Sequence, residues 1–485
     1  MNRVYAWITA AAISLSVQGA IAADPHSGAV RLRAESFIEH MVSDEPFANA
    51  PVGVLAVTLS GDTLACWQSG LRLVPASNVK LITCAAALET LGPDWRYPTT
   101  LAYSGSISAE GRLRGDLYIV GGADPTTGAK DPTSPDVSVT FARWKRLLDR
   151  AGIKSVEGSV IGDGRILPPD GGSPDWSSED LGFYFGAIPE GLNFYKNTHD
   201  MQVLPGSAPG EKVQIEEIYP ELPWMNYSHS ATTGPAGSGD RLYYECSGIV
   251  PMAGMYGTLG IDKGKRREQC TNRFGALTCA QRFCAFLQEA GISVGGSFAD
   301  IDLNGRIRKG FHDAGAPADS LTIIGSAESP PLLNIIKECL FESDNFYAET
   351  LLKTLGIKYK GSPQYDSCLV VEKQVLRSLG ANPAGMQLRD GSGLSRKNYV
   401  SAEYFVRLLS AVAAGPDGST FASALPSPGQ GSLAGNMSKQ TPEFRGRIKM
   451  KSGSMDGVRC YSGYVVPADG EKEDTIIFSV MINNN

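Results

Sequence analysis

Strand patterns at the two ends of the chain constrain its fold more than any other feature. Near the N-terminus, residues 52–59 are predicted to form a strand, a turn follows at 60–62, and a second strand is predicted at 63–67. The C-terminal part predicts three more strands, at 447–452, 459–466 and 475–482. Antiparallel strands at both ends, with helices between them, indicate one α/β layer domain whose sheet is closed by the two termini.

Outside one long central region, most of the remaining chain shows the helical spacing of apolar residues. The helices predicted in this way cover 32–43, 78–91, 332–340, 345–355, 365–379 and 402–413. From about residue 97 to 330, short strand candidates such as 113–120 and 159–161 alternate with Gly, Pro and Asp clusters. Only 139–151 and 277–290 are predicted to be helical there, so this region is expected to be a mostly β, separately folded insertion.

The first residues predict export. Arg3 precedes an uncharged, largely apolar run that reaches Val17, and Ala20-Ile21-Ala22 has the small-x-small pattern of a signal-peptidase site. We expect cleavage after Ala22 and a periplasmic product. The apolar run is shorter than the roughly 20 residues that a spanning helix needs, so no stable membrane anchor is expected.

Length, charge and cysteine content exclude several classes of protein. A chain of 485 residues is too long for one ordinary core, and its net charge of -7, with no basic stripe, argues against nucleic acid. Nine cysteines leave at least one unpaired in a monomer; Cys246 to Cys270 is one of many possible bridges. Apolar helical surroundings predict buried thiols at Cys84, Cys284 and Cys339. The five histidines lack metal-ligand spacing.

A serine and a lysine three residues apart stand at the start of the predicted helix 78–91. Ser77 opens its first turn and Lys80 lies one turn on, so the hydroxyl and the amine share a face. A serine needs a neighbouring base to become a nucleophile, and a lysine serves only if its pKa is lowered by burial or by a second cation. Alone, the pair is weak evidence for a catalytic site, because roughly one or two Ser-x-x-Lys matches are expected by chance in a chain this long.

Two further short motifs give the pair its partners. Ser343 and Asn345, in Ser343-Asp344-Asn345, join two predicted helices, and Lys451 begins Lys451-Ser452-Gly453-Ser454 on a terminal strand. Ser-x-x-Lys, Ser-Asp-Asn and Lys-Thr-Gly in this order are typical of serine enzymes that are acylated by D-alanyl peptides or β-lactams. Ser452 replaces the usual threonine and keeps the hydroxyl.

Each residue type suits a step of such chemistry. Ser343 can relay a proton to the leaving amine, Asn345 faces the Ser-Lys pair, and Lys451 favours the neutral form of Lys80. The hydroxyls of Ser452 and Ser454 suit a peptide carboxylate, and Gly453 lets substrate lie close to the strand. Backbone N–H groups of Ser77 and Ser454 are expected to form the oxyanion hole.

The similarity extends beyond the three motifs. The segments that carry it are Pro75 to Gly92, Gly115 to Tyr118 with Gly121 to Pro125, Asp390 to Arg396, and Gly446 to Gly463. With them the chain resembles the class C low-molecular-mass penicillin-binding proteins, the D-Ala-D-Ala carboxypeptidase/endopeptidase family S13. The run Asp390 to Gly393 is interpreted as a structural turn that supports the cleft. The last strand ends at Asn483 to Asn485, where the resemblance implies a further helix.

The resemblance implies the fold, the domains and the activity. It implies an α/β serine β-lactamase/DD-peptidase domain at 23–96 and 331–485, after the signal peptide at 1–22. A mostly β domain is expected at 97–122 and 191–330, with a second domain nested at 123–190. The implied activity is that of a serine-type D-Ala-D-Ala carboxypeptidase or endopeptidase acting on peptidoglycan peptides through an acyl-enzyme, with β-lactam antibiotics as covalent inhibitors and no metal or organic cofactor.

Two other functions stay open at this point. A β-lactamase needs a residue that places the deacylating water, and Glu349-Thr350-Leu351-Leu352-Lys353 follows the second motif too closely and lacks the asparagine of a Glu-x-x-Leu-Asn loop. A catalytically idle wall-binding protein of the same fold has no need of intact Ser77, Lys80 and Lys451.

Overall fold

The computed structural model describes residues 28–44, 47–168, 171–435, 446–467 and 472–484. The predicted signal peptide at 1–22 therefore lies outside the described residues. By its internal contacts the chain divides into two units: unit 1 comprises residues 1–93 and 333–485, and unit 2 comprises residues 94–332. The sequence expected the corresponding boundaries near residues 96 and 331. Each unit is described by itself.

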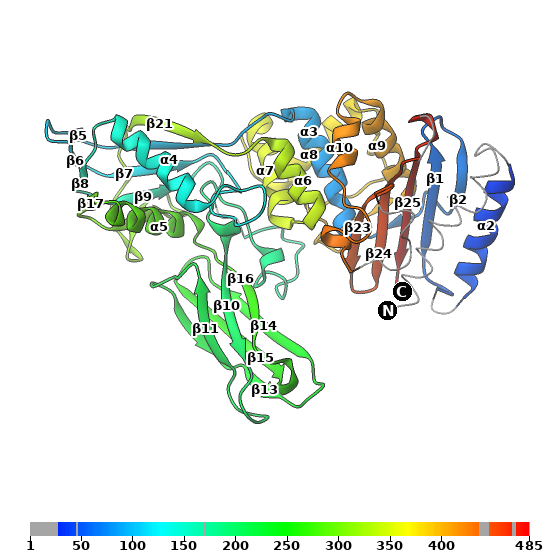
Figure 1. Ribbon diagram of the computed structural model, residues 1–485, viewed down its shortest axis with the longest axis horizontal. Helices are drawn as coiled ribbons and strands as arrows, with labels where there is room; N and C mark the ends of the chain where they lie inside the picture. Colours follow the sequence, from blue (N-terminus) through cyan, green and yellow to red (C-terminus); the bar gives the residue numbers. More distant parts are fainter. Residues whose placement is uncertain (1–27, 45–46, 169–170, 436–445, 468–471, 485) are drawn as a thin grey trace. The chain divides into compact units, whose positions relative to one another are not determined.

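Unit 1 is built on a five-stranded antiparallel sheet in the order β2-β1-β25-β24-β23 (Figure 1). Its strands are β1 (Val52–Thr58), β2 (Thr63–Trp67), β23 (Ile448–Met455), β24 (Val458–Val465) and β25 (Ile476–Asn483). The last strand pairs with the first along their full lengths, from Val52 opposite Ile482 to Thr58 opposite Ile476. The two ends of the chain thus meet inside one sheet, as the strand patterns predicted.

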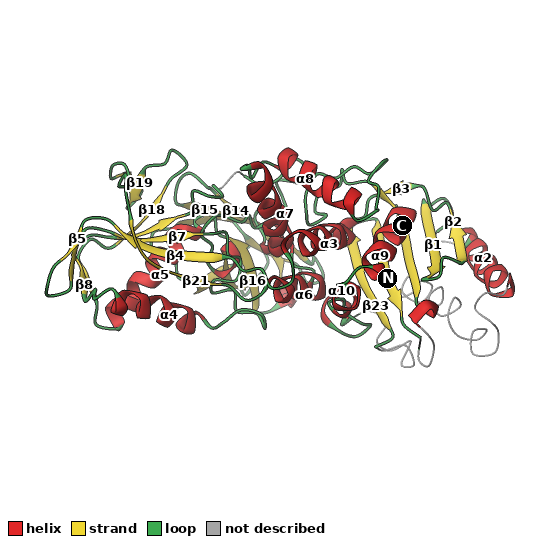
Figure 2. Ribbon diagram, turned by 90° about the horizontal axis from the view of Figure 1, so that it is seen from above, coloured by secondary structure: helices red, strands yellow, loops and turns green. Residues whose placement is uncertain are grey.

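Helices cover both faces of this sheet. Helix α2 (Gly28–Ser43) packs Ala34, Ile38 and Met41 onto the face that carries Val52, Val54 and Ala56. Helix α9 (Ala402–Ala414) lies on the opposite face, where Ala402 approaches Gly53. The alternation of side chains along β1 therefore serves two helices, one on each face. Figure 2 shows α9 lying across the strands and α2 beside β2.

The remaining helices of unit 1 form a cluster beside strand β23. They are α3 (Val79–Leu91), α6 (Leu332–Glu342), α7 (Asn345–Lys360), α8 (Tyr365–Ser378) and the short α10 (Gly418–Ser423). Ala86 of α3, Leu355 of α7 and Val371 of α8 share a buried apolar cluster. The apolar spacing predicted α3, α6, α7, α8 and α9 to within a few residues, except that α7 extends to Lys360. Two short strands, β3 (Arg72–Leu73) and β22 (Val400–Ser401), pair with each other.

Unit 2 contains a seven-stranded mixed sheet in the order β20-β19-β18-β9-β7-β4-β21. The strands are β4 (Pro98–Tyr103), β7 (Leu117–Gly121), β9 (Val160–Asp163), β18 (Phe298–Ile301), β19 (Ile307–Lys309), β20 (His312–Asp313) and β21 (Thr322–Glu328). Helices α4 (Val137–Arg150) and α5 (Gly275–Glu289) pack against it through an aromatic core that includes Phe141, Trp144 and Phe283. The sequence predicted both helices.

A small sheet at one end of unit 2 has the order β17-β8-β6-β5. Its strands are β5 (Ser106–Ile107), β6 (Arg112–Arg114), β8 (Ser155–Val156) and β17 (Ser293–Val294). The sequence predicted a single strand over 113–120, which was wrong. The run breaks at Gly115-Asp116, so that β6 and β7 belong to different sheets.

Residues 198–271 form sheets of their own (Figure 1, green). The strands are β10 (Thr198–Leu204), β11 (Gln214–Tyr219), β12 (Asn226–His229), β13 (Thr232–Gly234), β14 (Asp240–Cys246), β15 (Met252–Gly260) and β16 (Arg266–Thr271). The segment 123–190, expected as a nested domain, contributes β9 to the seven-stranded sheet and β8 to the small sheet. The predicted division of residues 97–330 into two domains stays a prediction.

Strand β23 lies at the edge of the unit 1 sheet and packs against η1, a single 3-10 turn at Ala76–Asn78. A Cβ added at Gly453 would lie 2.4 Å from the Pro75 carbonyl oxygen and 3.3 Å from the Ala76 Cβ. Real Cβ atoms do not approach a backbone oxygen so closely, so only glycine permits this contact.

We therefore expect Gly453→Ala to push the strand and the turn apart and to destabilise the protein by about 1 to 3 kcal/mol. Urea unfolding of unit 1 measures the change. Gly435→Ala is the matched control, because no atom of the described residues lies within 4 Å of its added Cβ. Equal stability of the two variants would contradict the close packing at Gly453.

Candidate active site

Ser77 lies in the 3-10 turn η1, immediately before helix α3, rather than in the first turn of the helix as the sequence predicted. The preceding residue, Ala76, has a left-handed backbone with φ of +46°. Such a conformation costs a non-glycine residue of order 1 to 3 kcal/mol and persists only where its surroundings impose it. Ala76 is closely packed on two sides: a Cβ at Gly393 would lie 2.0 Å from the Ala76 oxygen, and one at Gly453 would lie 3.3 Å from the Ala76 Cβ.

The segment that carries Ser77 is also tied to the sheet. The Val74 N–H donates to Asn483 Oδ1 at 2.8 Å, and Asn483 Nδ2 donates back to the Val74 carbonyl at 3.1 Å. Asn78 Nδ2 donates to Ser462 Oγ on β24 at 2.8 Å. The nucleophile candidate is thus fixed on both sides while its own side chain stays half-exposed.

Lys80 presents its amine to three acceptors. Its Nζ lies 3.0 Å from Ser77 Oγ, 2.6 Å from Asn345 Oδ1 and 2.8 Å from the Ser392 carbonyl oxygen. The side chain is fully buried. Burial lowers the pKa of Lys80. Because three oxygens surround an amine that burial disfavours as an ammonium, Lys80 is suited to exchange a proton with Ser77.

Lys451 lies on β23, fully buried, and burial holds its pKa well below the usual lysine value, with repulsion from Lys80 as the next cause. Its Nζ donates to the Ser452 carbonyl oxygen at 2.7 Å, the one acceptor found for it within the described parts of the chain. Repulsion between two buried amines is mutual, so a proton on either one favours the neutral form of the other.

The second motif is split between two roles. Asn345 begins helix α7, and Asp344 caps that helix by accepting a hydrogen bond from the Tyr347 N–H at 2.9 Å. Ser343 occupies a left-handed turn between α6 and α7, with φ of +65°, and is half-buried. Over the residues that the structure describes, its hydroxyl has no hydrogen bond to Ser77 or Lys80. The structure thus joins Asn345 directly to Lys80 and places Ser343 only at the adjoining turn.

The third motif runs along the edge strand. Ser452 is half-buried, Gly453 is buried against η1, and Ser454 is exposed. On its other side β23 pairs with β24, with Gly453 opposite Cys460. The motif therefore follows the sheet edge directly beside the turn that carries Ser77.

Several residues that border the site were not singled out as functional by the sequence. Ser392 reaches Lys80 through its backbone oxygen, and Glu349 of α7, fully buried, accepts hydrogen bonds from the Gly391 and Ser392 N–H groups. One sequence signal exists for Glu349: it lies four residues after Asn345 and so shares its face of the helix. Cys84 and Cys339 are buried thiols nearby, with Sγ atoms 3.6 Å apart.

The cysteines are free thiols, and the buried histidine His199 lies in a hydrogen-bond network. All nine cysteines are free, including Cys246 and Cys270, and Cys84, Cys284 and Cys339 are buried as predicted. His199 is buried between Tyr244 OH, 2.8 Å from Nε2, and Tyr227 OH, 3.1 Å from Nδ1, which is a structural network. In the described ranges, no cluster of three or more His, Cys, Asp or Glu residues has the arrangement of a metal site.

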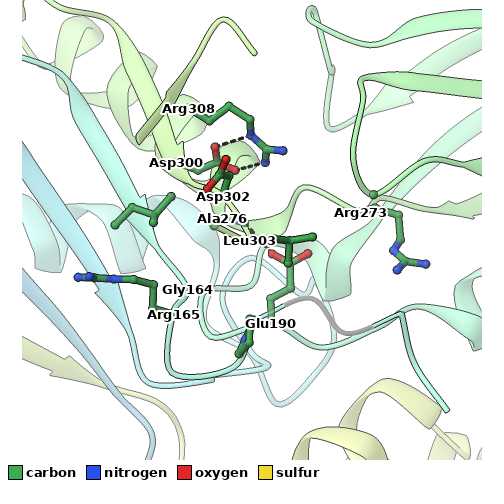
Figure 3. Close-up of a pocket in the computed structure, with 12 residues that line it drawn as sticks. Gly164, Arg165, Glu190, Arg273, Ala276, Asp300, Asp302, Leu303 and Arg308 are labelled. Carbon is green, nitrogen blue, oxygen red and sulfur yellow. Dashed lines mark hydrogen bonds and ion pairs between the residues drawn. The ribbon is translucent and has the colours of Figure 1, made fainter. Parts of the chain in front are cut away.

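A polar cavity in unit 2 is a separate feature (Figure 3). Asp300 faces Arg308 in a two-pronged ion pair, and Glu190 accepts a hydrogen bond from the Ala276 N–H at 3.4 Å. Burial raises the pKa of Glu190 to about 8, so this carboxyl is largely protonated at neutral pH. Among the described residues, the lining of the cavity includes no serine or lysine, so it offers no nucleophile of the kind found in unit 1.

No helix within the described residues is long and apolar enough to cross a membrane.

Comparison with known proteins agrees with this geometry. A D-alanyl-D-alanine carboxypeptidase from Actinomadura sp. (strain R39) is 30% identical over 100% of this chain and 87% of its own length. The solved structure of penicillin binding protein 4 (dacB) from Haemophilus influenzae has a TM-score of 0.76 at 20% identity, covering 92% of this chain and 93% of that one. The same Haemophilus protein has also been solved in complex with a β-lactam, with a TM-score of 0.70. These solved structures confirm the predicted fold.

The sequence model of the D-Ala-D-Ala carboxypeptidase 3 (S13) family matches residues 34–485, which is nearly the whole described chain. Together with the 30% identical relative, this match confirms the predicted family. The chain belongs to the D-Ala-D-Ala carboxypeptidase 3 (S13) family and is an enzyme of that family.

Proposed function

We propose that Ser77 is the nucleophile of this carboxypeptidase and Lys80 its base. The observation that carries the proposal is the 3.0 Å separation of Lys80 Nζ and Ser77 Oγ, with the amine buried and held from two other sides. A serine hydroxyl becomes a nucleophile when such a neighbour accepts its proton. The substrate proposed is a peptidoglycan stem peptide that ends in D-Ala-D-Ala.

In the first step Ser77 Oγ attacks the carbonyl carbon between the two terminal D-alanines while its proton passes to Lys80. Backbone N–H groups of Ser77 and Ser454 hold the oxyanion, a contribution worth about 3 to 4 kcal/mol per donor. The C–N bond then breaks, Ser343 with Lys451 helps return a proton to the leaving D-alanine amine, and water later releases the acyl group. Ser452, Gly453 and Ser454 bind the terminal carboxylate.

β-Lactam antibiotics are proposed to acylate the same serine, because they present a reactive carbonyl to a site of this geometry. The β-lactamase alternative requires a free base near the acyl group. Glu349 is a poor candidate, since Oε1 accepts two backbone N–H groups and Oε2 accepts the Tyr365 hydroxyl at 3.0 Å. The alternative of a catalytically idle wall-binding protein does not explain why Ser77, Lys80 and Asn345 are held within hydrogen-bond distance of one another.

We also propose that the protein is exported to the periplasm, with cleavage after Ala22. The support for this lies in the sequence of the first residues, and N-terminal sequencing of the mature protein decides it.

Intact-mass analysis after incubation with a fluorescent penicillin tests the nucleophile. We expect the wild type to gain the mass of one penicillin and Ser77→Ala to gain none, because the carbon–oxygen bond requires Oγ. Ser378→Ala, at the exposed end of α8, is the matched control and labels as the wild type does. Labelling of Ser77→Ala would overturn the assignment, and rapid loss of the adduct with hydrolysed drug would favour a β-lactamase.

The pH dependence of acylation tests the two lysines. Since burial lowers the pKa of Lys80, the acylation rate is expected to rise with pH and to level off below the usual lysine pKa of about 10.4. Burial and repulsion from Lys80 hold the pKa of Lys451 well below the usual lysine value, so Lys451 is the amine that loses its proton first. Removing its side chain in Lys451→Ala is therefore expected to leave the midpoint of the rise, which Lys80 sets, in place.

Stopped-flow acylation by penicillin across the neutral and alkaline range measures this midpoint. Lys449→Ala, two residues earlier on β23, is the control and leaves it in place. A midpoint that moves to higher pH in Lys451→Ala but not in Lys449→Ala would show instead that Lys451 keeps its proton while Lys80 titrates.

A further inference from the structure

Glu349 has a buried carboxyl group that the proposed chemistry does not use, and burial raises its pKa to about 7. It lies one helical turn after Asn345 on α7 and is fully buried. Its Oε1 accepts the Ser392 N–H at 2.7 Å and the Gly391 N–H at 3.0 Å, and its Oε2 accepts the Tyr365 hydroxyl at 3.0 Å. Three donors therefore converge on one side chain, and each of its oxygens acts as an acceptor.

The loop that Glu349 holds also contacts Lys80. The backbone oxygen of Ser392, the residue whose N–H makes the shorter bond to Glu349, accepts a hydrogen bond from Lys80 Nζ at 2.8 Å. A single residue thus connects the carboxylate of α7 to the amine of α3. Neither contact involves the Ser392 side chain.

The same loop is fixed from its other sides. Thr83 Oγ1 donates to the Gly391 oxygen at 2.9 Å, and Asp390 accepts the Gly393 N–H at 2.9 Å and the Ser395 N–H at 2.6 Å. A Cβ on Gly391 would lie 2.9 Å from the Leu352 Cβ and 3.0 Å from the Ala348 oxygen, so the loop sits directly on α7. Several independent contacts therefore fix the position of the Ser392 oxygen.

A third carboxyl group, that of Glu372, also contacts the loop through Thr83. Thr83 Oγ1 also lies 3.0 Å from Glu372 Oε1, and burial raises the pKa of Glu372 to about 8. Protonated Glu372 donates to Thr83, whose own proton is then free for the Gly391 oxygen. Hydrogen bonds therefore run from the Glu372 carboxyl to the Thr83 hydroxyl and from that hydroxyl to the Gly391 oxygen.

The position of the Ser392 oxygen matters for catalysis because a neutral amine must point its lone pair, not an N–H bond, at the serine. Uncharged Lys80 has two N–H donors and one lone pair. Asn345 Oδ1 and the Ser392 oxygen take the two N–H groups, which leaves the lone pair to face Ser77 Oγ. Without the Ser392 oxygen, an N–H bond is free to point at the serine, and the amine then cannot accept its proton.

We propose that Glu349 is a positioning residue that holds the Ser392 backbone oxygen against Lys80 and so directs the lone pair of the amine at Ser77. This inference rests on the proposed roles of Ser77 and Lys80. It assigns Glu349 no contact with substrate. The residue acts through two backbone N–H groups, and its length matters more than its charge.

Two substitutions separate length from charge. Glu349→Gln keeps an oxygen that accepts both N–H groups and an amide that donates to Tyr365 OH, whereas Glu349→Asp keeps the carboxyl group but is one methylene shorter. We expect the limiting acylation rate of Glu349→Asp to fall about 10- to 100-fold, as for a small misplacement of a reacting group. Glu349→Gln is expected to keep most of the wild-type rate, and the dissociation constant of the initial penicillin complex stays unchanged in both.

Stopped-flow acylation at saturating penicillin measures the limiting rate separately from binding, and thermal unfolding checks that each variant is folded. Gly391→Ala provides a second route, because its Cβ lifts the loop from α7 while Glu349 stays intact, and it is expected to lower the limiting rate in the same way. Gly70→Ala, whose nearest neighbour is an ordinary contact at 3.6 Å, is the matched control.

Wild-type rates for both Glu349→Asp and Gly391→Ala would overturn the proposal, as would a loss in Glu349→Gln equal to that in Glu349→Asp. Failure of the underlying chemistry looks different, because then wild-type protein itself acquires no penicillin at Ser77. If wild-type protein is acylated at Ser77 and the variants match it, only the role of Glu349 is wrong.

Discussion

The burial of the Lys80 amine is the constraint on which the rest of the site depends. An ammonium removed from water loses several kcal/mol of solvation unless its surroundings replace that solvation. Three oxygens, from Ser77, Asn345 and Ser392, supply part of the replacement while burial still lowers the pKa. The result is an amine that is held in place in either protonation state, which a base that gains and loses a proton in each cycle requires.

Three separate parts of unit 1 must meet for this arrangement to exist. The 3-10 turn before α3 brings Ser77, the start of α7 brings Asn345, and the loop after Asp390 brings the Ser392 oxygen. Each is fixed by contacts that leave little freedom: Asn78 and Val74 tie the turn to the sheet, and Glu349 ties the loop to α7. The left-handed backbone of Ala76 is kept by close contacts with glycines on both sides. The energy of folding the sheet and helices is thus used to hold a strained turn beside a buried amine.

The framework of unit 1 follows directly from the sequence pattern. The strand patterns near the two ends of the chain predicted the sheet, and apolar spacing predicted α7 and α9, because burial on one face of a helix repeats with the period of the helix. The three motifs predicted which side chains to look for, and the structure joins Ser77, Lys80 and Asn345.

What the pattern missed depends on backbone atoms and on contacts between distant segments. The Ser392 contribution is a carbonyl oxygen, which every residue type possesses, so no letter in the sequence identifies it. The left-handed conformation of Ala76 is imposed by Gly393 and Gly453, which lie hundreds of residues away along the chain. Gly115 gave a local signal, a glycine within an apolar run, yet the break between β6 and β7 follows from their places in two different sheets.

The most direct test of the account is a ¹³C NMR titration of protein labelled at the lysine Cε carbons, with the Lys80 signal assigned by its loss in Lys80→Arg. The account predicts that Lys80 titrates clearly below the usual lysine pKa of about 10.4, because its amine is buried. A Lys80 signal that titrates at the usual value would contradict the claim that this amine is poised to accept the proton of Ser77.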